Sequence, residues 1–238
     1  MGSIAKDDKL YLFAFVHFLP GKYNTWQGAY DVLAKYVWAE EPTTETYYFG
    51  IPFDFADDFD NTPMMFAFEV YDKRDSLYGV HFTSEVMQQK FIPVALPSMT
   101  TGFDLQHYSH VGGGFLDRSG DGAACGLMYD VKIKCTSPAA RDRVVARLAD
   151  LGPEIQHEAS KRTTDDDGVG GILTWMAFAS QDVDTDARML MRFRDKTAFH
   201  AYTKLQPVQD FWAAGKAEDI DKMEQRGYVE NGRGWLHR

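Results

Sequence analysis

A helical pattern that occurs twice limits the folds that this chain can adopt. After Asp75, five residues follow steps of three and four, the spacing of one face of an α-helix: Leu77, Val80, Ser84, Met87 and Phe91. At an offset of 121 residues the same spacing recurs as Ala198, Ala201, Leu205, Val208 and Trp212. An apolar strand, 64–70 or 187–193, precedes each helix, and a charged turn joins the two. We therefore expect two copies of one structural unit.

Each copy is predicted to have the element order βαββαβ. In the first copy, strands are expected at 11–18, 44–51, 64–71 and 103–111, and helices at 22–38 and 75–91, the latter capped by Asp75. In the second copy, strands are expected at 127–135, 171–179, 187–193 and 227–236, and helices begin at Ser137-Pro138 and at Thr197.

This element order predicts how the copies bury their sheets. An antiparallel four-stranded sheet with both helices on one face leaves its other face apolar and uncovered, so two such sheets can cover each other. We expect the α+β class, with tandem ferredoxin-like halves at 10–111 and 126–238 that form one intramolecular dimeric α+β barrel. The glycine-rich stretch 112–125 is predicted to be a linker.

Composition and charge exclude several classes of function. The 238 residues are 45% hydrophobic, which is enough for a globular core. A formal charge of −10 repels phosphate backbones and anionic membranes, so we expect no nucleic-acid partner and no membrane partner. The sequence contains neither a signal-peptide pattern nor an apolar run of the roughly 18 residues that a membrane helix needs, which favours a cytoplasmic protein.

Cofactor and metal motifs are also missing from the sequence. Cys125 and Cys135 lack partners spaced for a zinc site, and the calcium-loop-like stretch from Asp182 has Ala187 and Phe193 where glycine and glutamate are needed. Glycine-rich phosphate loops and hydrolase motifs do not occur. We therefore expect no metal, flavin or nucleotide cofactor.

Four short motifs in the first copy follow one another in a defined order. They are Pro20-Gly21 before a helix, Glu41-Pro42 before a strand, Glu69-Val70-Tyr71 within a strand and His81 on the next helix. Over about residues 10–111 this order resembles the antibiotic-biosynthesis monooxygenase (ABM) domain of the dimeric α+β barrel superfamily. The second copy shares the fold pattern but lacks the motifs. The resemblance implies two units fused into a pseudo-dimer, with further oligomerisation left open.

The resemblance also implies a reaction, namely oxygenation of an electron-rich aromatic or enolisable substrate by dioxygen without flavin, haem or metal. Such a reaction needs a pocket that removes a proton, holds the resulting anion and excludes water. Histidine suits the role of base because its unperturbed pKa is near neutrality. The catalytic candidates are His81 beside the helical stripe, Glu69 and Tyr71 on one face of a strand, and His17 on the first strand.

Each candidate also has a plainer interpretation. Either histidine can be a surface residue or a hydrogen-bonded core residue, Glu69 can pair with a lysine across the sheet, and Tyr71 can be a packing residue. Five aromatic residues are expected to bind the substrate: Phe13, Phe15, Trp26, Tyr47 and Phe66.

The repeat allows a comparison of the two copies. At the 121-residue offset, Glu69, Tyr71 and His81 correspond to Leu190, Arg192 and Tyr202. The second copy thus keeps the apolar stripe and loses the polar set. This favours a single working pocket in the first copy, although two pockets for different ligands would give the same asymmetry.

The leading function is a cofactor-independent monooxygenase of a small aromatic or lipid-like metabolite, with dioxygen as the second substrate. One alternative is a lyase or isomerase that uses the same pocket for proton transfer only. Another is a non-catalytic barrel for small-molecule binding or stress response, which a pocket filled by large side chains such as Phe13, Phe66 and Trp26 would favour.

Overall fold

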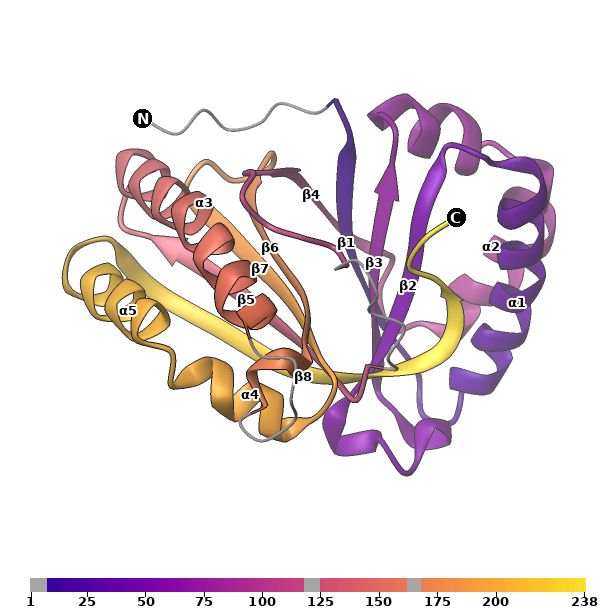
Figure 1. Cartoon of the computed structure of the whole chain (residues 1–238). Helices are drawn as coiled ribbons and strands as arrows, with labels where there is room; N and C mark the ends of the chain where they lie inside the picture. The colour runs from indigo at the N-terminus through magenta and orange to yellow at the C-terminus, as the bar shows by residue number, and fades with distance from the viewer. Residues whose placement is uncertain (1–7, 118–124, 162–167) are drawn as a thin grey trace. The chain divides into compact units, whose positions relative to one another are not determined.

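The computed structural model describes residues 8–117, 125–161 and 168–238 (Figure 1). The chain divides into two compact units. One unit comprises Asp8–His107 with Glu230–Arg238, and the other comprises the described part of Tyr108–Val229. The predicted linker, 112–125, includes residues 118–124, which lie outside the described residues. The predicted domain boundaries stay a prediction.

The first unit is a sheet covered on one face by helices. Its elements are strands β1 (Leu10–His17), β2 (Thr44–Pro52) and β3 (Met64–Tyr71), the start of β4 (Asp104–His110), the end of β8 (Ile220–Trp235), and helices α1 (Tyr23–Glu40) and α2 (Ile92–Ala95). Strand β3 lies between β1 and β2 and pairs antiparallel with both. All eight residues of β3 are buried, which explains why its sequence is a continuous apolar run rather than an alternation.

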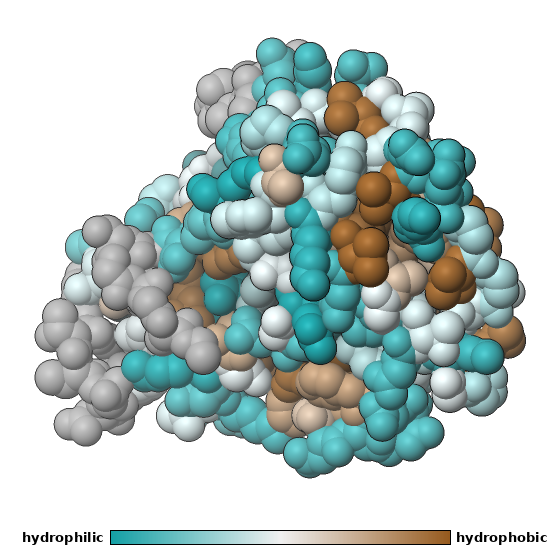
Figure 2. All heavy atoms as spheres, turned by 90° about the vertical axis from the view of Figure 1, so that its right-hand side faces the viewer, coloured by the Kyte–Doolittle hydropathy of each residue, from teal (hydrophilic) through white to brown (hydrophobic). Residues whose placement is uncertain are grey.

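Helix α1 packs on this sheet through an aromatic stripe. Its buried residues, which include Trp26, Tyr30, Leu33 and Val37, recur at helical spacing. The outer side of the helices is mixed. Figure 2 faces that side and shows apolar groups interrupted by hydrophilic ones, and the exposed apolar residues of this unit include Val32 on α1 and Val94 on α2.

The second unit repeats the arrangement. Its elements are β5 (Leu127–Cys135), α3 (Pro138–Lys161), β6 (Ile172–Ser180), β7 (Asp186–Phe193), α4 (Lys196–Thr203), α5 (Gln206–Glu218), the start of β8 and the end of β4. Strand β7 lies between β5 and β6, β8 pairs with the free edge of β5, and β4 pairs with β6. The Ser137 hydroxyl accepts a hydrogen bond from the Ala140 amide at the start of α3, so the predicted cap is confirmed.

The predicted fold class is confirmed. Hydrogen-bonded neighbours follow the closed order β1-β3-β2-β8-β5-β7-β6-β4, which is that of an eight-stranded antiparallel α+β barrel built from a tandem of βαββαβ repeats. Among the described residues, no helix is long and apolar enough to cross a membrane.

Three elements differ from the sequence prediction. The helix expected from Thr197 is two helices, because Pro207 in the first turn of α5 has no N–H to donate to the Thr203 carbonyl four residues back and so cannot continue α4. Strand β8 begins at Ile220, seven residues before the predicted start, since its largely exposed first part lacks an apolar pattern. Asp75 lies in helical geometry and makes no capping hydrogen bond, so it is not the predicted N-cap.

The helix predicted at 75–91 differs most. Residues Ser76–His81 and Met87–Phe91 form π-helical turns, with a turn between them, and the helical path continues to Ser98. The Phe82 amide donates to the Leu77 carbonyl five residues back. This wider turn carries His81 to the inner face, where it is 3% exposed, and leaves Val80 43% exposed. Val80 therefore does not belong to the buried stripe.

Candidate active site

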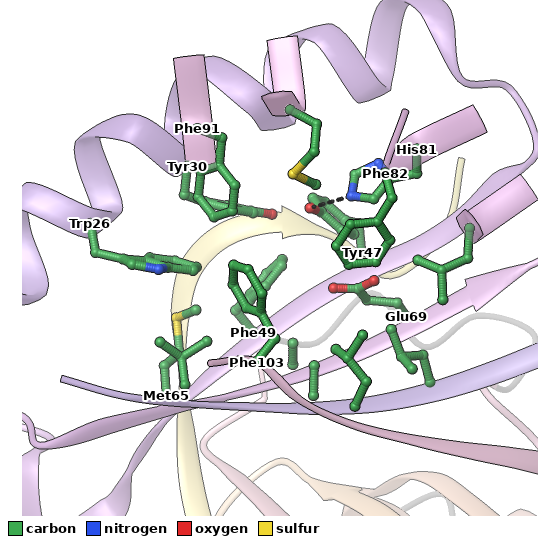
Figure 3. A pocket seen from close by; sticks show the side chains of 17 residues that line it. Trp26, Tyr30, Tyr47, Phe49, Met65, Glu69, His81, Phe82, Phe91 and Phe103 are labelled. Carbon is green, nitrogen blue, oxygen red and sulfur yellow. Dashed lines mark hydrogen bonds between the residues drawn. The ribbon is translucent and has the colours of Figure 1, made fainter. Parts of the chain in front are cut away.

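A cavity lies between the sheet and the helices of the first unit (Figure 3). Its volume is about 40 Å³, room for about two or three water molecules. Strand residues at alternate positions form its floor, among them Leu12, Ala14 and Val16 of β1. Seven aromatic rings form much of the wall: Trp26, Tyr30, Tyr47, Phe49, Phe82, Phe91 and Phe103. The cavity is narrow and largely apolar.

His81 is held in this cavity by a buried carboxylate. Its Nδ1 lies 2.7 Å from Glu41 Oε2, and the two side chains are 3% and 1% exposed. Because a carboxylate oxygen accepts hydrogen bonds, this contact places a proton on Nδ1 and leaves Nε2 as the acceptor of the neutral ring. Nε2 lies 3.5 Å from the Tyr47 hydroxyl, the contact drawn in Figure 3. The arrangement resembles a base fixed in one tautomer by a third group.

Glu69 projects from β3 into the same cavity. It is 7% exposed, and it accepts a 2.7 Å hydrogen bond from the Tyr71 hydroxyl. Burial raises the pKa of its carboxyl from 4.5 to about 7, with Glu41 adding to the effect and with His81 and the Tyr71 hydrogen bond opposing it. A carboxyl group with this pKa is partly protonated and partly ionised at neutral pH, so it can donate or accept a proton there.

The phenol groups of the site remain neutral. Burial raises the pKa of Tyr30, Tyr47 and Tyr71 well above 10, and the nearby Glu69 carboxylate raises it further. These tyrosines are therefore hydrogen-bond donors at physiological pH rather than bases.

Two donors in the cavity wall have no acceptor. The indole Nε1 of Trp26 and the hydroxyl of Tyr30 are buried without a hydrogen-bond partner among the described residues. Both rings extend from α1 into the cavity (Figure 3). Buried donors are almost always paired, so a molecule that occupies the cavity, water or ligand, is expected to supply the acceptors.

The structure brings together four of the predicted site residues and leaves one beside them. His81, Glu69, Trp26 and Tyr47 line the cavity, and Tyr71 adjoins it through its hydrogen bond to Glu69.

Four other predicted site residues do not reach the cavity. Since Leu12, Ala14 and Val16 face it, the alternate residues of β1 point to the opposite side of the sheet: Phe13, Phe15 and His17. Phe66 lies on that opposite side too, with its ring centroid 5.9 Å from Phe13 and 5.6 Å from Phe15. His17 is exposed.

Sequence reasoning missed Glu41 as a functional residue. It occurs in the Glu41-Pro42 motif, which was used only to support the resemblance. A chemical argument could have identified Glu41, because a buried histidine on the neighbouring helix needs an acceptor for its ring proton. Tyr30 belongs to the buried stripe of α1, and its unpaired hydroxyl could not be inferred from that position.

Strand register corrects the comparison between the two copies. Glu69 pairs with Leu12 on one side and Tyr47 on the other. The residue with the equivalent neighbours, Tyr129 and Trp175, is Met191. Leu190, the counterpart at the 121-residue offset, therefore points to the other face of its strand. For the same reason Phe193, not Arg192, corresponds to Tyr71.

In the second copy, a contact between two side chains that are neutral at physiological pH takes the place of the contact between Tyr47 and His81. Tyr47 and His81 meet in the first unit, and their counterparts Trp175 and Tyr202 meet in the second, where the Trp175 Nε1 donates to the Tyr202 hydroxyl at 3.2 Å. The second unit thus keeps the geometry and lacks the acid–base groups.

Metal ligands are not clustered in the described part of the chain: no group of three or more His, Cys, Asp or Glu side chains there is placed to hold an ion. Cys125 and Cys135 are both buried, and neither forms a disulfide.

The similarity of this chain to known proteins lies in its fold. No protein-family model and no curated protein matches the sequence. Two solved structures named "putative monooxygenase" match over nearly the whole chain. The protein from Lactobacillus acidophilus NCFM has a TM-score of 0.64 and 8% identity, with 97% of each chain covered. The protein from Fusobacterium nucleatum has a TM-score of 0.67 and 11% identity, again with 97% of each chain covered.

A third solved structure, named "anthrone oxidase-like protein", has a TM-score of 0.59 and 14% identity, and the match covers 98% of this chain and 95% of that chain. These matches extend over both copies at once. The predicted resemblance is therefore confirmed at the level of fold: the whole chain shares the α+β barrel fold of two proteins named putative monooxygenase and of one named anthrone oxidase-like protein.

Proposed function

We propose that the protein is a cofactor-independent monooxygenase of a small aromatic or lipid-like metabolite, and that the proton is abstracted in the cavity of the first unit. The observation that carries this proposal is the buried His81–Glu41 pair, which faces Glu69 inside an aromatic cavity. The partners are then a small-molecule substrate and dioxygen. A cytoplasmic location stays a prediction.

His81 is the base in this proposal. With Nδ1 hydrogen-bonded to Glu41, Nε2 takes a proton from an acidic C–H or O–H group of the substrate. The Glu41 carboxylate then stabilises the imidazolium that forms, as the acidic member of a catalytic triad does. Glu41 does not touch the substrate and acts as a positioning residue.

Glu69 and the phenols hold the substrate anion. In its protonated form, Glu69 donates a hydrogen bond to the developing oxyanion, since its pKa of about 7 leaves much of it protonated at neutral pH. The Tyr47 hydroxyl is a second donor beside it. Trp26 and Tyr30 bind further oxygen atoms of the substrate through their unpaired donors. A flat substrate with several carbonyl or phenol oxygens fits this set.

The reaction balances without an added reductant. A methylene group activated by an adjacent aromatic carbonyl loses a proton to His81, and the carbanion reacts with dioxygen. Loss of the second hydrogen with cleavage of the O–O bond gives a new carbonyl, so that CH₂ and O₂ become C=O and H₂O. The substrate supplies all of the electrons, which is why neither flavin nor metal is required in this scheme.

Anthrone, an enolisable aromatic ketone, is a suitable probe for this chemistry. Under ¹⁸O₂, the protein should speed its conversion to the quinone above the spontaneous rate and place one labelled oxygen in the product. Replacing His81 by alanine should lower turnover by about 10²-fold or more, the scale of a lost general base. His157→Ala, a change of the same type at an exposed position of α3, should leave the rate unchanged.

A further variant sharpens this test. Glu41→Gln should lower kcat by more than about tenfold with little change in KM, because the ring loses its fixed tautomer. Equal rates for the His81 and His157 variants would refute the assignment of the base. Products that carry no label would exclude oxygenation and favour a lyase or isomerase.

A non-catalytic binding protein is the second candidate. The small volume of the cavity favours it, since Trp26 and six other rings occupy most of the space. In that case anthrone should bind without faster conversion. Under either function, entry of an aromatic substrate or ligand into a cavity of about 40 Å³ requires Phe82 and Phe103, the half-buried rings of the wall, to move.

A further inference from the structure

The second unit has a cavity of its own, between its sheet and helices α4 and α5. Its volume is about 360 Å³, within the range of about 300–1,000 Å³ that is usual for small-molecule sites. The wall is mostly aromatic and aliphatic, with Tyr129, Met191, Phe199, Val208 and Trp212 among the lining residues. The proposed reaction of the first unit makes no use of this space.

The chemistry of this cavity differs from that of the first. Met191 stands in place of Glu69, and Tyr202 stands in place of His81. Burial raises the pKa of the Tyr129 and Tyr202 hydroxyls, so both remain neutral. Neither a carboxylate nor an imidazole lines the cavity among the described residues, so general-base catalysis has no group to perform it.

Two polar groups of the wall point to the kind of ligand. The Tyr202 hydroxyl is 3% exposed and accepts from Trp175, and its own proton has no acceptor among the described residues. Lys216 on α5 lies at the rim, exposed to solvent, and is the cation of the lining set. A buried donor without an acceptor and a cation at the entrance both favour a ligand that carries oxygen atoms and negative charge.

We propose that this cavity binds a small apolar organic anion, an aromatic carboxylate or sulfonate, without transforming it. The apolar body packs against Phe199, Val208 and Trp212. The anionic group faces Lys216 at the rim, and an oxygen or nitrogen acceptor of the body takes the proton of Tyr202. Binding here does not depend on the reaction proposed for the first unit, because the two cavities share no residues.

A pair of fluorescent probes tests the site on the full-length protein. The probes 8-anilinonaphthalene-1-sulfonate and N-phenyl-1-naphthylamine have the same aromatic body, and only the first carries a charge. Both should bind, the sulfonate more tightly. Lys216→Met should weaken the sulfonate about fivefold, the value of one exposed ion pair, and leave the neutral probe unchanged. The matched control is Lys204→Met, an exposed lysine outside the cavity, which should alter neither probe.

A cavity-filling variant completes the test. Val208→Trp should abolish binding of both probes, with circular dichroism used to confirm that the variant is folded. Unchanged probe binding to folded Val208→Trp would overturn the location. Loss of the sulfonate preference in Lys204→Met, or its retention in Lys216→Met, would overturn the role of the cation and with it the proposed ligand class. Because Lys216 is exposed, its variant decides the matter even if Val208→Trp does not fold.

Discussion

Replacing Glu69 by glutamine should change how the stability of the protein depends on pH. Glu69 is buried, and the pKa of its carboxyl rises from 4.5 to about 7 on folding. Between these two pH values the folded protein binds more protons than the unfolded chain, so the free energy of unfolding falls as pH rises through this window. At about 1.36 kcal/mol per pKa unit, the loss amounts to about 3 kcal/mol by pH 8.

Glutamine has the shape of the protonated acid and keeps an oxygen to accept from the Tyr71 hydroxyl. Glutamine cannot ionise, so the free energy of unfolding of the variant does not fall in this way as pH rises. Relative to the wild-type protein, Glu69→Gln should therefore gain about 2.5 kcal/mol in the free energy of unfolding between pH 5 and pH 8, since part of the total loss has already occurred at pH 5. Any cost of the amide group that does not depend on pH cancels in this comparison.

Urea denaturation at half-unit steps from pH 5 to pH 8 measures the difference. Glu85→Gln is the matched control, because Glu85 is exposed, on the helical segment that follows β3. Its curve should run parallel to that of the wild-type protein. A parallel curve for Glu69→Gln would instead refute the reasoning, since it would mean that Glu69 is ionised at no cost in the folded state.

Three further predictions concern stability and can be measured by urea or thermal denaturation. Arg188→Met should lower the free energy of unfolding by about 3–5 kcal/mol, because it leaves the buried Asp130 unpaired. The double variant with Asp130→Leu should recover most of this loss, and equal losses in the single and double variants would contradict the prediction. Gly234→Ala should cost at least about 1–3 kcal/mol, because Gly234 has φ +74° and an added Cβ would strike the Tyr47 carbonyl; an unchanged midpoint would contradict it. Ser137→Ala should cost about 1 kcal/mol through the lost helix cap, and Ser137→Asp should not.

The sequence was sufficient to predict the repeated architecture because apolar periodicity is set by burial. The strand Met64–Tyr71 and the strand Leu127–Cys135 have the predicted bounds, since the first is a nearly continuous apolar run, the second interleaves apolar and polar residues, and both lie between clear turns. Periodicity could not reveal the π-helical turns, because a wider turn changes which residue faces inward without changing the residues themselves. Val80 was therefore placed inside and proved exposed.

The site was predicted in part. The pairing of Glu69 with Tyr71 follows from the alternation of side chains along a strand, and the structure shows it as a hydrogen bond. The same alternation could not say which face of β1 meets the helices, so Phe13, Phe15 and His17 were placed on the side of the cavity that they do not reach. The role of Glu41 depends on its contact with His81, forty positions away in the sequence, and no local sequence pattern reveals such a contact.

The π-helical turn at Ser76–His81 coincides with one additional residue in the sequence of the first copy. Glu69 and His81 are twelve positions apart, whereas their counterparts Met191 and Tyr202 are eleven apart, in a copy whose helix α4 is an ordinary α-helix. One additional residue in a helix is accommodated as such a turn. In this comparison, one additional residue coincides with the rotation of an ionisable ring into an apolar interior. Removal of Gly79, which lies between Tyr78 and Val80, would restore the spacing of the second copy.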